Sequence, residues 1–287
     1  MMYKILLICL FFGSASFLKA QDVIKGTILD QNNQPIPYVN VGVLNTAIGT
    51  VSQENGQFEL LVDQVKASDT IKISTIGFSS RAFVLQNLRS MLEQNPQIKL
   101  SAIQYDLAEV TVKPLIFEEF GFDKTSTDRN TNFAISKFPR QNLGAEIARK
   151  FKMNKYTKRS KSKACRLDAL KFYLRSCDYD WAKLRVMVYH LEDGKPGTPL
   201  LNENVIVEVK KGQTGWVEVN LKPYDLIVDG DIALGLEWID HSPTGRRLSL
   251  PIAFPAVGST HFYQFGSQNA WKKFPNMSTP MVIKVAY

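Results

Sequence analysis

The sequence predicts an all-β protein made of two β-sandwiches in series. Short runs of alternating apolar and polar residues recur along the chain, and turns rich in Gly, Asn and Pro separate them. A polar stretch near residue 128 divides these runs into two sets. The length of 287 residues suits two domains. The hydrophobic content of 45% can supply a core for each.

Residues 1–20 have the layout of a secretory signal peptide. Lys4 precedes an apolar run over residues 5–12, and small residues then lead to Ala20. This run is shorter than the roughly 20 apolar residues that a membrane anchor needs. We therefore expect export, with a mature chain that begins near Gln21. The expected location is the periplasm, the outer membrane or the cell surface.

The first domain is expected over residues 22–113. Pro35 and Pro37 cannot donate to a central ladder, so they belong at a strand start or at a sheet edge. Asn55-Gly56 is a strong hairpin signal, because a type I′ turn needs positive φ at both central residues. Strands are expected at residues 23–29, 38–44, 50–53, 58–62, 70–74, 81–85, 98–100 and 107–113, with one or two helical turns at 87–94. Seven or more short strands at this spacing are typical of a β-sandwich.

Several segments of this domain resemble the carboxypeptidase regulatory-like domain. They are GTILD at 26–30, QPIPYVNV at 34–41, GTVS at 49–52, NGQF at 55–58, STIGF at 74–78 and LAEVTV at 107–112. The resemblance implies a small transthyretin-like sandwich without catalytic residues of its own. In the family this domain is attached to zinc carboxypeptidases and to TonB-dependent outer-membrane transporters. The remaining sequence fits neither, because it is too short for a large barrel and its three histidines form no His-x-x-Glu pair.

A linker is predicted at residues 114–142, followed by the second domain at residues 143–287. Residues 123–132 are polar without periodicity and are the expected flexible joint. The second domain is predicted as a jelly-roll-like sandwich. Its strands are expected at residues 167–174, 183–190, 205–209, 216–221, 231–239, 260–265 and 280–287. The runs at 215–221 and 231–239 are loosely similar to galactose-binding-like envelope sandwiches, a similarity that implies no functional residues.

Two cysteines, Cys165 and Cys177, remain after the predicted processing. Export permits a disulfide. The strand expected at residues 167–174 rises about 3.3 Å per residue, however, and the Cα atoms of a disulfide lie within about 7 Å. We therefore expect two free thiols, and a disulfide only if this strand is absent.

No catalytic residues, cofactor or metal ion are expected from motifs. The sequence has no nucleophile elbow, no phosphate loop and no cluster of metal ligands. Carboxylates that meet only in the fold stay an alternative, and Glu237 and Asp240 are the nearest candidates. The competing interpretation places Glu237 on the solvent face of an alternating strand.

Four residues are candidates for ligand binding: Trp181, Trp271, Glu237 and His241. Exposed aromatic rings can stack on the apolar face of a sugar. Trp181 and Trp271 have loop-like surroundings in the sequence, whereas Trp238 alternates with leucines as a core residue does. The alternative for every tryptophan is core filling.

Residues 149–166 hold nine basic residues and no acidic one. The formal charge of the chain is +8, and it stays positive after removal of Lys4 and Lys19 with the signal peptide. Such an excess favours anionic partners. The functional interpretation is a patch for anionic lipid or polysaccharide surfaces, and the alternative is a solvated loop. The patch consists of Lys155, Lys158, Arg159, Lys161 and Lys163.

These observations predict a non-enzymatic exported envelope protein that acts as a binding or scaffolding module. Its expected partners are an envelope protein or a glycan, and nucleic acid is not expected because no recognition helix is visible. One alternative is a carbohydrate-binding protein that serves polysaccharide uptake. Another is a hydrolase that uses carboxylates without a sequence motif. A groove lined by exposed tryptophan would favour the former, and two facing acids in a cleft the latter.

Overall fold

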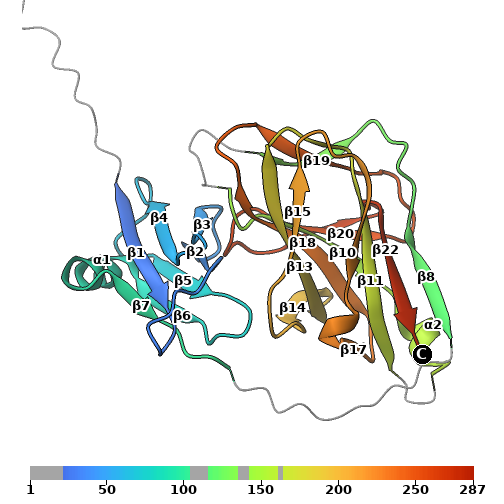
Figure 1. Cartoon of the computed structure of the whole chain (residues 1–287), viewed down its shortest axis with the longest axis horizontal. Coiled ribbons are helices and arrows are strands. Elements are labelled where there is room, and N and C mark those ends of the chain that lie inside the picture. The colour runs from blue at the N-terminus through green and yellow to red at the C-terminus, as the bar shows by residue number, and fades with distance from the viewer. Residues whose placement is uncertain (1–21, 104–115, 135–141, 161–163) are drawn as a thin grey trace, which may run out of the picture.

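The regular secondary structure of the described residues is mostly β-strand, as predicted from the sequence (Figure 1). The computed structural model describes residues 22–103, 116–134, 142–160 and 164–287. The predicted signal peptide, the strand expected at 107–113 and the residues Lys161 and Lys163 lie outside these ranges. Within the described ranges, no helix is long and apolar enough to cross a bilayer.

The first domain consists of two small sheets and one helix. One sheet has the order β4 (Gln57–Leu61), β1 (Val23–Leu29), β7 (Gln97–Lys99). The other has the order β3 (Gly49–Val51), β2 (Asn40–Val43), β5 (Thr70–Ser74), β6 (Arg81–Val84). Helix α1 (Leu85–Gln94) covers the helical turns that the sequence predicts. Its buried Leu85, Leu88 and Leu92 join a core with residues of both sheets.

A turn forms at Asn55-Gly56, but the prediction of a type I′ hairpin is wrong, because only Gly56 of the pair has positive φ and the flanking strands β3 and β4 lie in different sheets. Gly56 has a φ of +76°, which a glycine adopts without steric cost. The side chain of Asn55 accepts a hydrogen bond from the backbone N–H of Gln57 at 3.0 Å. The turn thereby sets the start of β4.

The second domain is a larger sandwich. Its main sheet has the order β14 (Lys195–Pro199), β13 (Trp181–Glu192), β18 (Ile232–His241), β10 (Glu146–Phe151), β20 (Thr260–Gln264), β21 (Lys272–Pro275). A seventh strand of this sheet, β15 (Val205–Lys210), pairs with β13. The facing sheet has the order β16 (Gly215–Asn220), β11 (Cys165–Leu174), β22 (Met281–Ala286), β8 (Phe117–Phe122), and β17 (Ile227–Val228) also pairs with β11. A small sheet has the order β12 (Ser176–Cys177), β19 (Arg247–Pro251), β9 (Asn130–Ala134). Two short helical segments, α2 (Asn154–Thr157) and η1 (Lys222–Tyr224), complete the domain.

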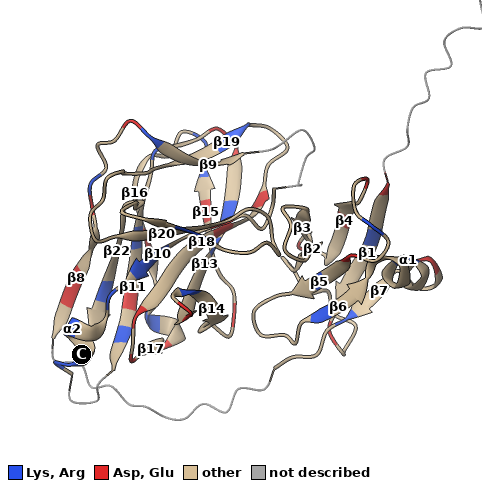
Figure 2. Cartoon of the chain, turned by 180° about the vertical axis from the view of Figure 1, so that it is seen from behind, with Lys and Arg blue, Asp and Glu red and all other residues tan. Residues whose placement is uncertain are grey.

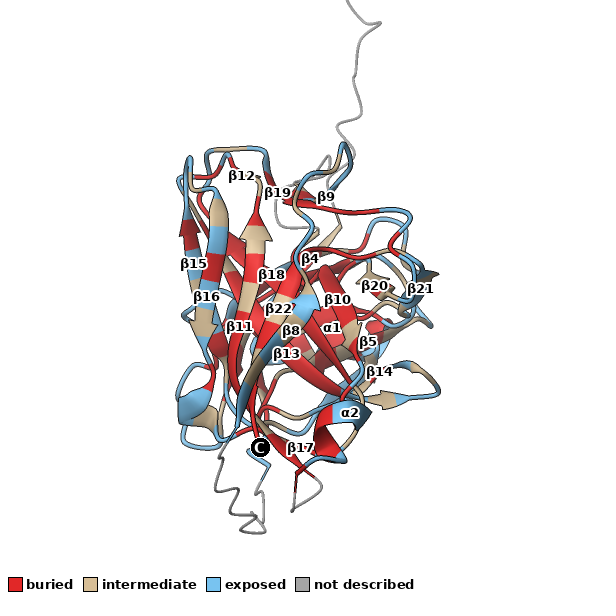
Figure 3. Cartoon of the chain, turned by 90° about the vertical axis from the view of Figure 1, so that its right-hand side faces the viewer, coloured by how far each residue is buried: buried red, intermediate tan, exposed pale blue. Residues whose placement is uncertain are grey.

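The centre of the main sheet is buried on both faces. Every residue of β18 is buried, and Figure 3 shows β10, β13 and β18 mostly in red. Along residues 183–190 of β13, Leu184, Val186 and Val188 alternate with Lys183, Arg185 and Met187, a pattern that predicts one buried and one exposed face. This prediction is wrong, because Arg185 and Met187 are buried as well. The first domain covers the face that would otherwise meet solvent.

The segment predicted as a linker holds two strands of the second domain. Strand β8 pairs with β22, and β9 pairs with β19. Arg175 donates hydrogen bonds to the backbone carbonyls of Thr125 and Thr127, at 2.9 and 2.8 Å. The described residues between 116 and 134 are therefore part of the second sandwich, which corrects the prediction of a flexible joint at 123–132.

Cys165 and Cys177 are free and buried, as expected. Cys165 begins the ten-residue strand β11, and Cys177 ends β12. Burial raises the pKa of the Cys165 thiol to about 11. It also raises the pKa of the Cys177 thiol, so both thiols are protonated and unreactive at neutral pH.

The two domains share apolar packing. Tyr38, Val51 and Ile76 of the first domain are buried within the core cluster of the second. Ser267 of the second domain lies so close to β2 and β3 that a Cβ at Gly42 or Gly49 would come within 2.7 or 2.5 Å of its hydroxyl oxygen. Glycine at these two positions thus permits the close approach of the domains.

Candidate functional site

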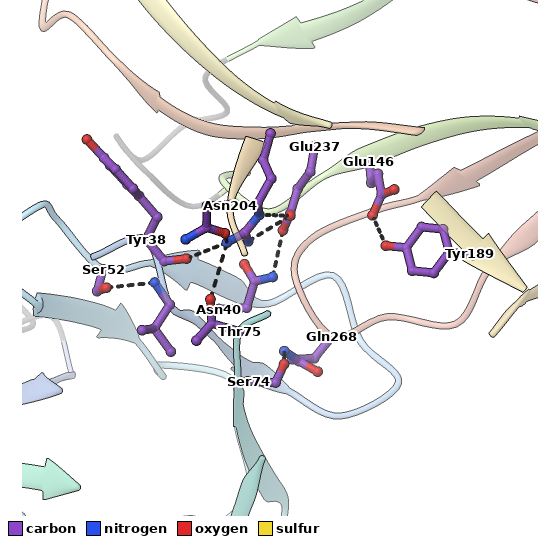
Figure 4. Close-up of polar contacts among 12 residues, drawn as sticks. Tyr38, Asn40, Ser52, Ser74, Thr75, Glu146, Tyr189, Asn204, Glu237 and Gln268 are labelled. Atoms are coloured by element: carbon purple, nitrogen blue, oxygen red, sulfur yellow. Dashed lines mark hydrogen bonds and ion pairs between the residues drawn. The ribbon is translucent and has the colours of Figure 1, made fainter. Parts of the chain in front are cut away.

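A cavity of about 460 Å³ lies between the two domains. Residues of β2, β5 and the turn after β5 form one wall, and residues of β10, β13, β14, β18 and the segment 264–271 form the other. A volume of this size is ordinary for a site that binds a small molecule, and such sites favour domain interfaces. Figure 4 shows the polar side chains that gather here.

A buried ion pair anchors the second-domain wall. Nε and Nη2 of Arg185 both lie 2.7 Å from Oε2 of Glu237, and each residue is at most 2% exposed. The other carboxylate oxygen of Glu237 accepts a hydrogen bond from Nδ2 of Asn40 in the first domain at 2.6 Å. Both oxygens of Glu237 are therefore occupied by protein partners.

The same arginine reaches into the first domain. Its Nη1 donates to the backbone carbonyl of Tyr38 at 2.9 Å and lies 3.3 Å from Oγ1 of Thr75. Lys183, two residues before it on β13, donates to the phenolic oxygen of Tyr38 at 2.6 Å. Because a buried charge needs hydrogen-bonded partners, these contacts fix the two domains to one another.

A second carboxyl group, Glu146, lines the cavity beside this ion pair. Its Oε2 accepts a hydrogen bond from the hydroxyl of Tyr189 at 2.7 Å, and its Oε1 has no partner among the described residues. Burial, reinforced by the negative charge of Glu237, raises the pKa of Glu146 well above its ordinary value. These surroundings favour the neutral form of Glu146, which can donate one hydrogen bond.

The rest of the lining is mostly uncharged. Amide and hydroxyl side chains come from both domains, namely Asn40, Ser74, Thr75, Ser80, Thr198, Gln264, Ser267 and Gln268. Trp271 contributes a half-buried indole ring, which lies edge-on to Tyr189 with their centroids 5.9 Å apart. Hydrogen-bonding groups of this kind next to an aromatic ring match a polyhydroxylated ligand.

Of the four ligand-binding candidates, two line this cavity and two lie elsewhere. Trp271 and Glu237 line it, and the interpretation of Glu237 as a solvent-facing residue is wrong. His241 is buried in the core, where its ring contacts those of Trp238 and Tyr179 at 5.0 and 4.9 Å. Trp181 lies at the start of β13, and Nζ of Lys183 lies 5.4 Å from the centroid of its ring.

Three residues central to the cavity were not predicted: Glu146, Arg185 and Tyr189. The available signal was a charged residue inside a largely apolar strand, as in Ala145-Glu146-Ile147-Ala148. Arg185 looked like a solvent-facing residue because it alternates with leucine and valine. The alternation of residues along a strand does not show whether another domain covers its polar face.

A second hollow, of about 620 Å³, lies over β8, β11 and β16. Three charged residues of its lining pair with one another, with Nζ of Lys171 2.8 Å from Glu119 and 3.8 Å from Glu218. Trp216 lies edge-on to Tyr173 at its border. No cluster of three or more potential metal ligands occurs in the described ranges.

Comparison with known proteins bears on the first domain. Residues 24–112 match the family described as the CarboxypepD_reg-like domain. The first domain is a carboxypeptidase regulatory-like domain. The match covers the segments on which the sequence resemblance rests, and it ends before β8.

The remaining comparisons are distant. No curated protein matches the chain. The cysteine protease and lectin-like domains of Cwp84, a surface layer associated protein of Clostridium difficile, share 13% identity over 56% of this chain, with a TM-score of 0.36. This chain spans 36% of that one.

Two further solved structures match over most of the chain. The clostridial cysteine protease Cwp84 after propeptide cleavage shares 11% identity, with 93% of this chain and 70% of that one covered and a TM-score of 0.38. VP2 of infectious bursal disease virus shares 9%, with 92% and 62% covered and a TM-score of 0.27. Likenesses this slight carry no argument about function.

Proposed function

We propose that this protein is an exported, non-catalytic binding protein of the cell envelope that holds a carbohydrate between its two domains. The observation that carries the proposal is the interdomain cavity, whose walls combine uncharged hydrogen-bonding groups of both domains with the ring of Trp271. The signal-like residues 1–20 and the regulatory-like first domain support export.

The state of the two acids supports binding rather than hydrolysis. A retaining or inverting glycosidase needs one free carboxylate as nucleophile or base. Arg185 and Asn40 occupy both oxygens of Glu237, and Glu146 is held neutral by its surroundings. A neutral acid and an immobilised ion pair can recognise hydroxyl groups without attacking them.

The ligand class follows from the charge of the lining. Arg185 and Glu237 neutralise each other, and burial favours the neutral form of Glu146, so Lys72 is the remaining charged residue of the lining in the described ranges. A neutral saccharide can satisfy amide and hydroxyl groups while its apolar face packs on Trp271. The partner is therefore a glycan, consistent with a role in polysaccharide capture.

Calorimetric titration of the mature chain with a panel of neutral di- to tetrasaccharides tests the proposal. We expect at least one member to bind, and Trp271→Ala to weaken binding by about tenfold or more, a change of ~1.4 kcal/mol. Trp181→Ala is the matched control, since Trp181 does not line the cavity, and it should bind as the parent does. Equal binding by the Trp271→Ala variant, or hydrolysis of the saccharide, would refute the proposal.

A further inference from the structure

An exposed apolar loop and a basic cleft lie together at one edge of the second domain. The loop comprises residues 252–259, between β19 and β20. Its Val257 is 88% exposed and its Phe254 51%. Large apolar side chains this exposed, only three residues apart, mark a surface that meets something other than water.

The loop is held in place by the segment that follows β21. The backbone N–H of Ala256 donates to the carbonyl of Asn276 at 2.7 Å, and the N–H of Gly258 donates to its Oδ1 at 3.2 Å. Ala256 is buried, so the loop is anchored between its two exposed apolar residues. Phe254 and Val257 are thus presented on a fixed scaffold.

The basic cleft begins directly beside the loop tip. Gly258, which follows Val257, lines a hollow of about 300 Å³ together with Lys150, Lys152 and Lys155. Lys152, Lys155 and the nearby Lys158 are exposed. Figure 2 shows basic segments beside α2, on which this cleft borders.

The charge of this edge is not neutralised by acidic side chains. Lys150 pairs with Asp231 at 2.8 Å, but no ion pair among the described residues involves Lys152, Lys155 or Lys158. The guanidinium of the exposed Arg129 lies 5.5 Å from the ring centroid of Phe254. Basic side chains therefore lie near both exposed apolar residues, Arg129 beside Phe254 and the lysine cleft beside Val257.

We propose that this edge docks the protein on an anionic lipid surface, with Phe254 and Val257 inserted at the boundary between headgroups and acyl chains. Lys152, Lys155 and Lys158 then contact the headgroups. Apolar residues flanked by lysine and arginine are the pattern of interfacial membrane binding. Two protruding side chains are too small a surface for a stable protein partner, which buries about 800 Å² on each side.

Flotation of the protein with phosphatidylcholine vesicles, with and without phosphatidylglycerol, tests this docking. We expect binding only to the anionic vesicles, with an affinity that falls as salt rises. The apolar loop is tested by the double variant Phe254→Ser/Val257→Ser, with Ile206→Ser as a control at an exposed apolar residue elsewhere. The basic cleft is tested by the triple variant Lys152→Ser/Lys155→Ser/Lys158→Ser. Its control, at three exposed lysines elsewhere, is Lys66→Ser/Lys195→Ser/Lys222→Ser. The triple lysine variant should bind about 100-fold more weakly, and its control far less so.

A fluorescent label reports insertion directly. Because Cys165 and Cys177 are buried, an environment-sensitive dye on a Val257→Cys variant labels the folded mature chain at one site. Its emission should rise and shift to the blue with anionic vesicles, whereas the same dye on Ile206→Cys should not respond. Absence of vesicle binding, or binding without a response at Val257→Cys, overturns the proposal. Vesicle-independent association lost in Phe254→Ser/Val257→Ser also overturns it, and assigns the loop to contact with a second copy.

Discussion

Glu146 and Glu237 lie directly opposite each other on the paired strands β10 and β18, in the wall of the interdomain cavity. Two ionised carboxylates opposite each other on neighbouring strands repel. The two acids have different partners, because Arg185 pairs with Glu237 whereas Tyr189 donates to Glu146. The cavity thus holds an ion-paired acid beside one whose pKa is raised, and the raised pKa of Glu146 makes the protein sensitive to pH.

Glu146→Gln should make the protein more tolerant of high pH. Burial and the charge of Glu237 raise the pKa of Glu146 in the folded chain, so the folded state keeps a proton that the unfolded state loses once pH exceeds the ordinary value of 4.5. The stability from the neutral acid is complete below that pH and declines as pH rises toward the folded pKa, by up to about 1.4 kcal/mol per pH unit. The amide keeps an acceptor for Tyr189 and does not titrate.

Urea unfolding at a series of pH values from 4 upward measures this effect. The gain in unfolding free energy of Glu146→Gln over the parent should grow with pH. Glu203→Gln, at an exposed position, is the control and should parallel the parent. A gain that does not change with pH would mean that Glu146 is ionised in the folded protein.

Arg185→Leu should be among the most destabilising single substitutions in the cavity wall. It leaves Glu237 buried without its cation, which costs about 3–5 kcal/mol. The double variant Arg185→Leu/Glu237→Leu should recover much of this loss, because no isolated charge remains. The matched control is Arg159→Leu, since Arg159 pairs with Glu118 at the surface, where water screens the pair, and its loss should change stability little. A single variant as stable as the parent would show that the ion pair does not hold the domains.

His261 should limit stability in acid. It is 1% exposed on β20, and burial lowers its pKa from 6.5 to about 4. The unfolded state therefore binds a proton first, and the stability that comes from the neutral ring is lost as pH falls from about 6.5 toward 4. His261→Leu should flatten the decline in unfolding free energy over this window. An unchanged acid profile in the variant would assign the acid sensitivity to other groups.

The sequence predicts the local architecture well where local signals exist. The helix α1 and the free thiols of Cys165 and Cys177 follow from short-range patterns, and the structure confirms them. A turn also forms at Asn55-Gly56, although it is not of type I′. The same patterns place Trp238 in the core, where it is 1% exposed.

Prediction from local sequence patterns fails where one domain covers another or where a strand is polar. Strand β9 (Asn130–Ala134) has almost no apolar alternation, yet its backbone pairs with β19. Arg185 occupies a position that periodicity assigns to solvent, yet it is buried and bonded to Tyr38 and Thr75 of the first domain. Both outcomes depend on long-range contacts, which a local pattern does not contain.

The central claim is that a saccharide is held by both domains at once. Hydrogen exchange of the mature chain, with and without the tightest-binding saccharide of the panel, tests it most directly. The account predicts slower exchange at residues 72–80 of the first domain and at residues 264–271 of the second in the same experiment. Protection confined to one domain, or found instead at residues 119–123 and 216–218 around the other hollow, would contradict it.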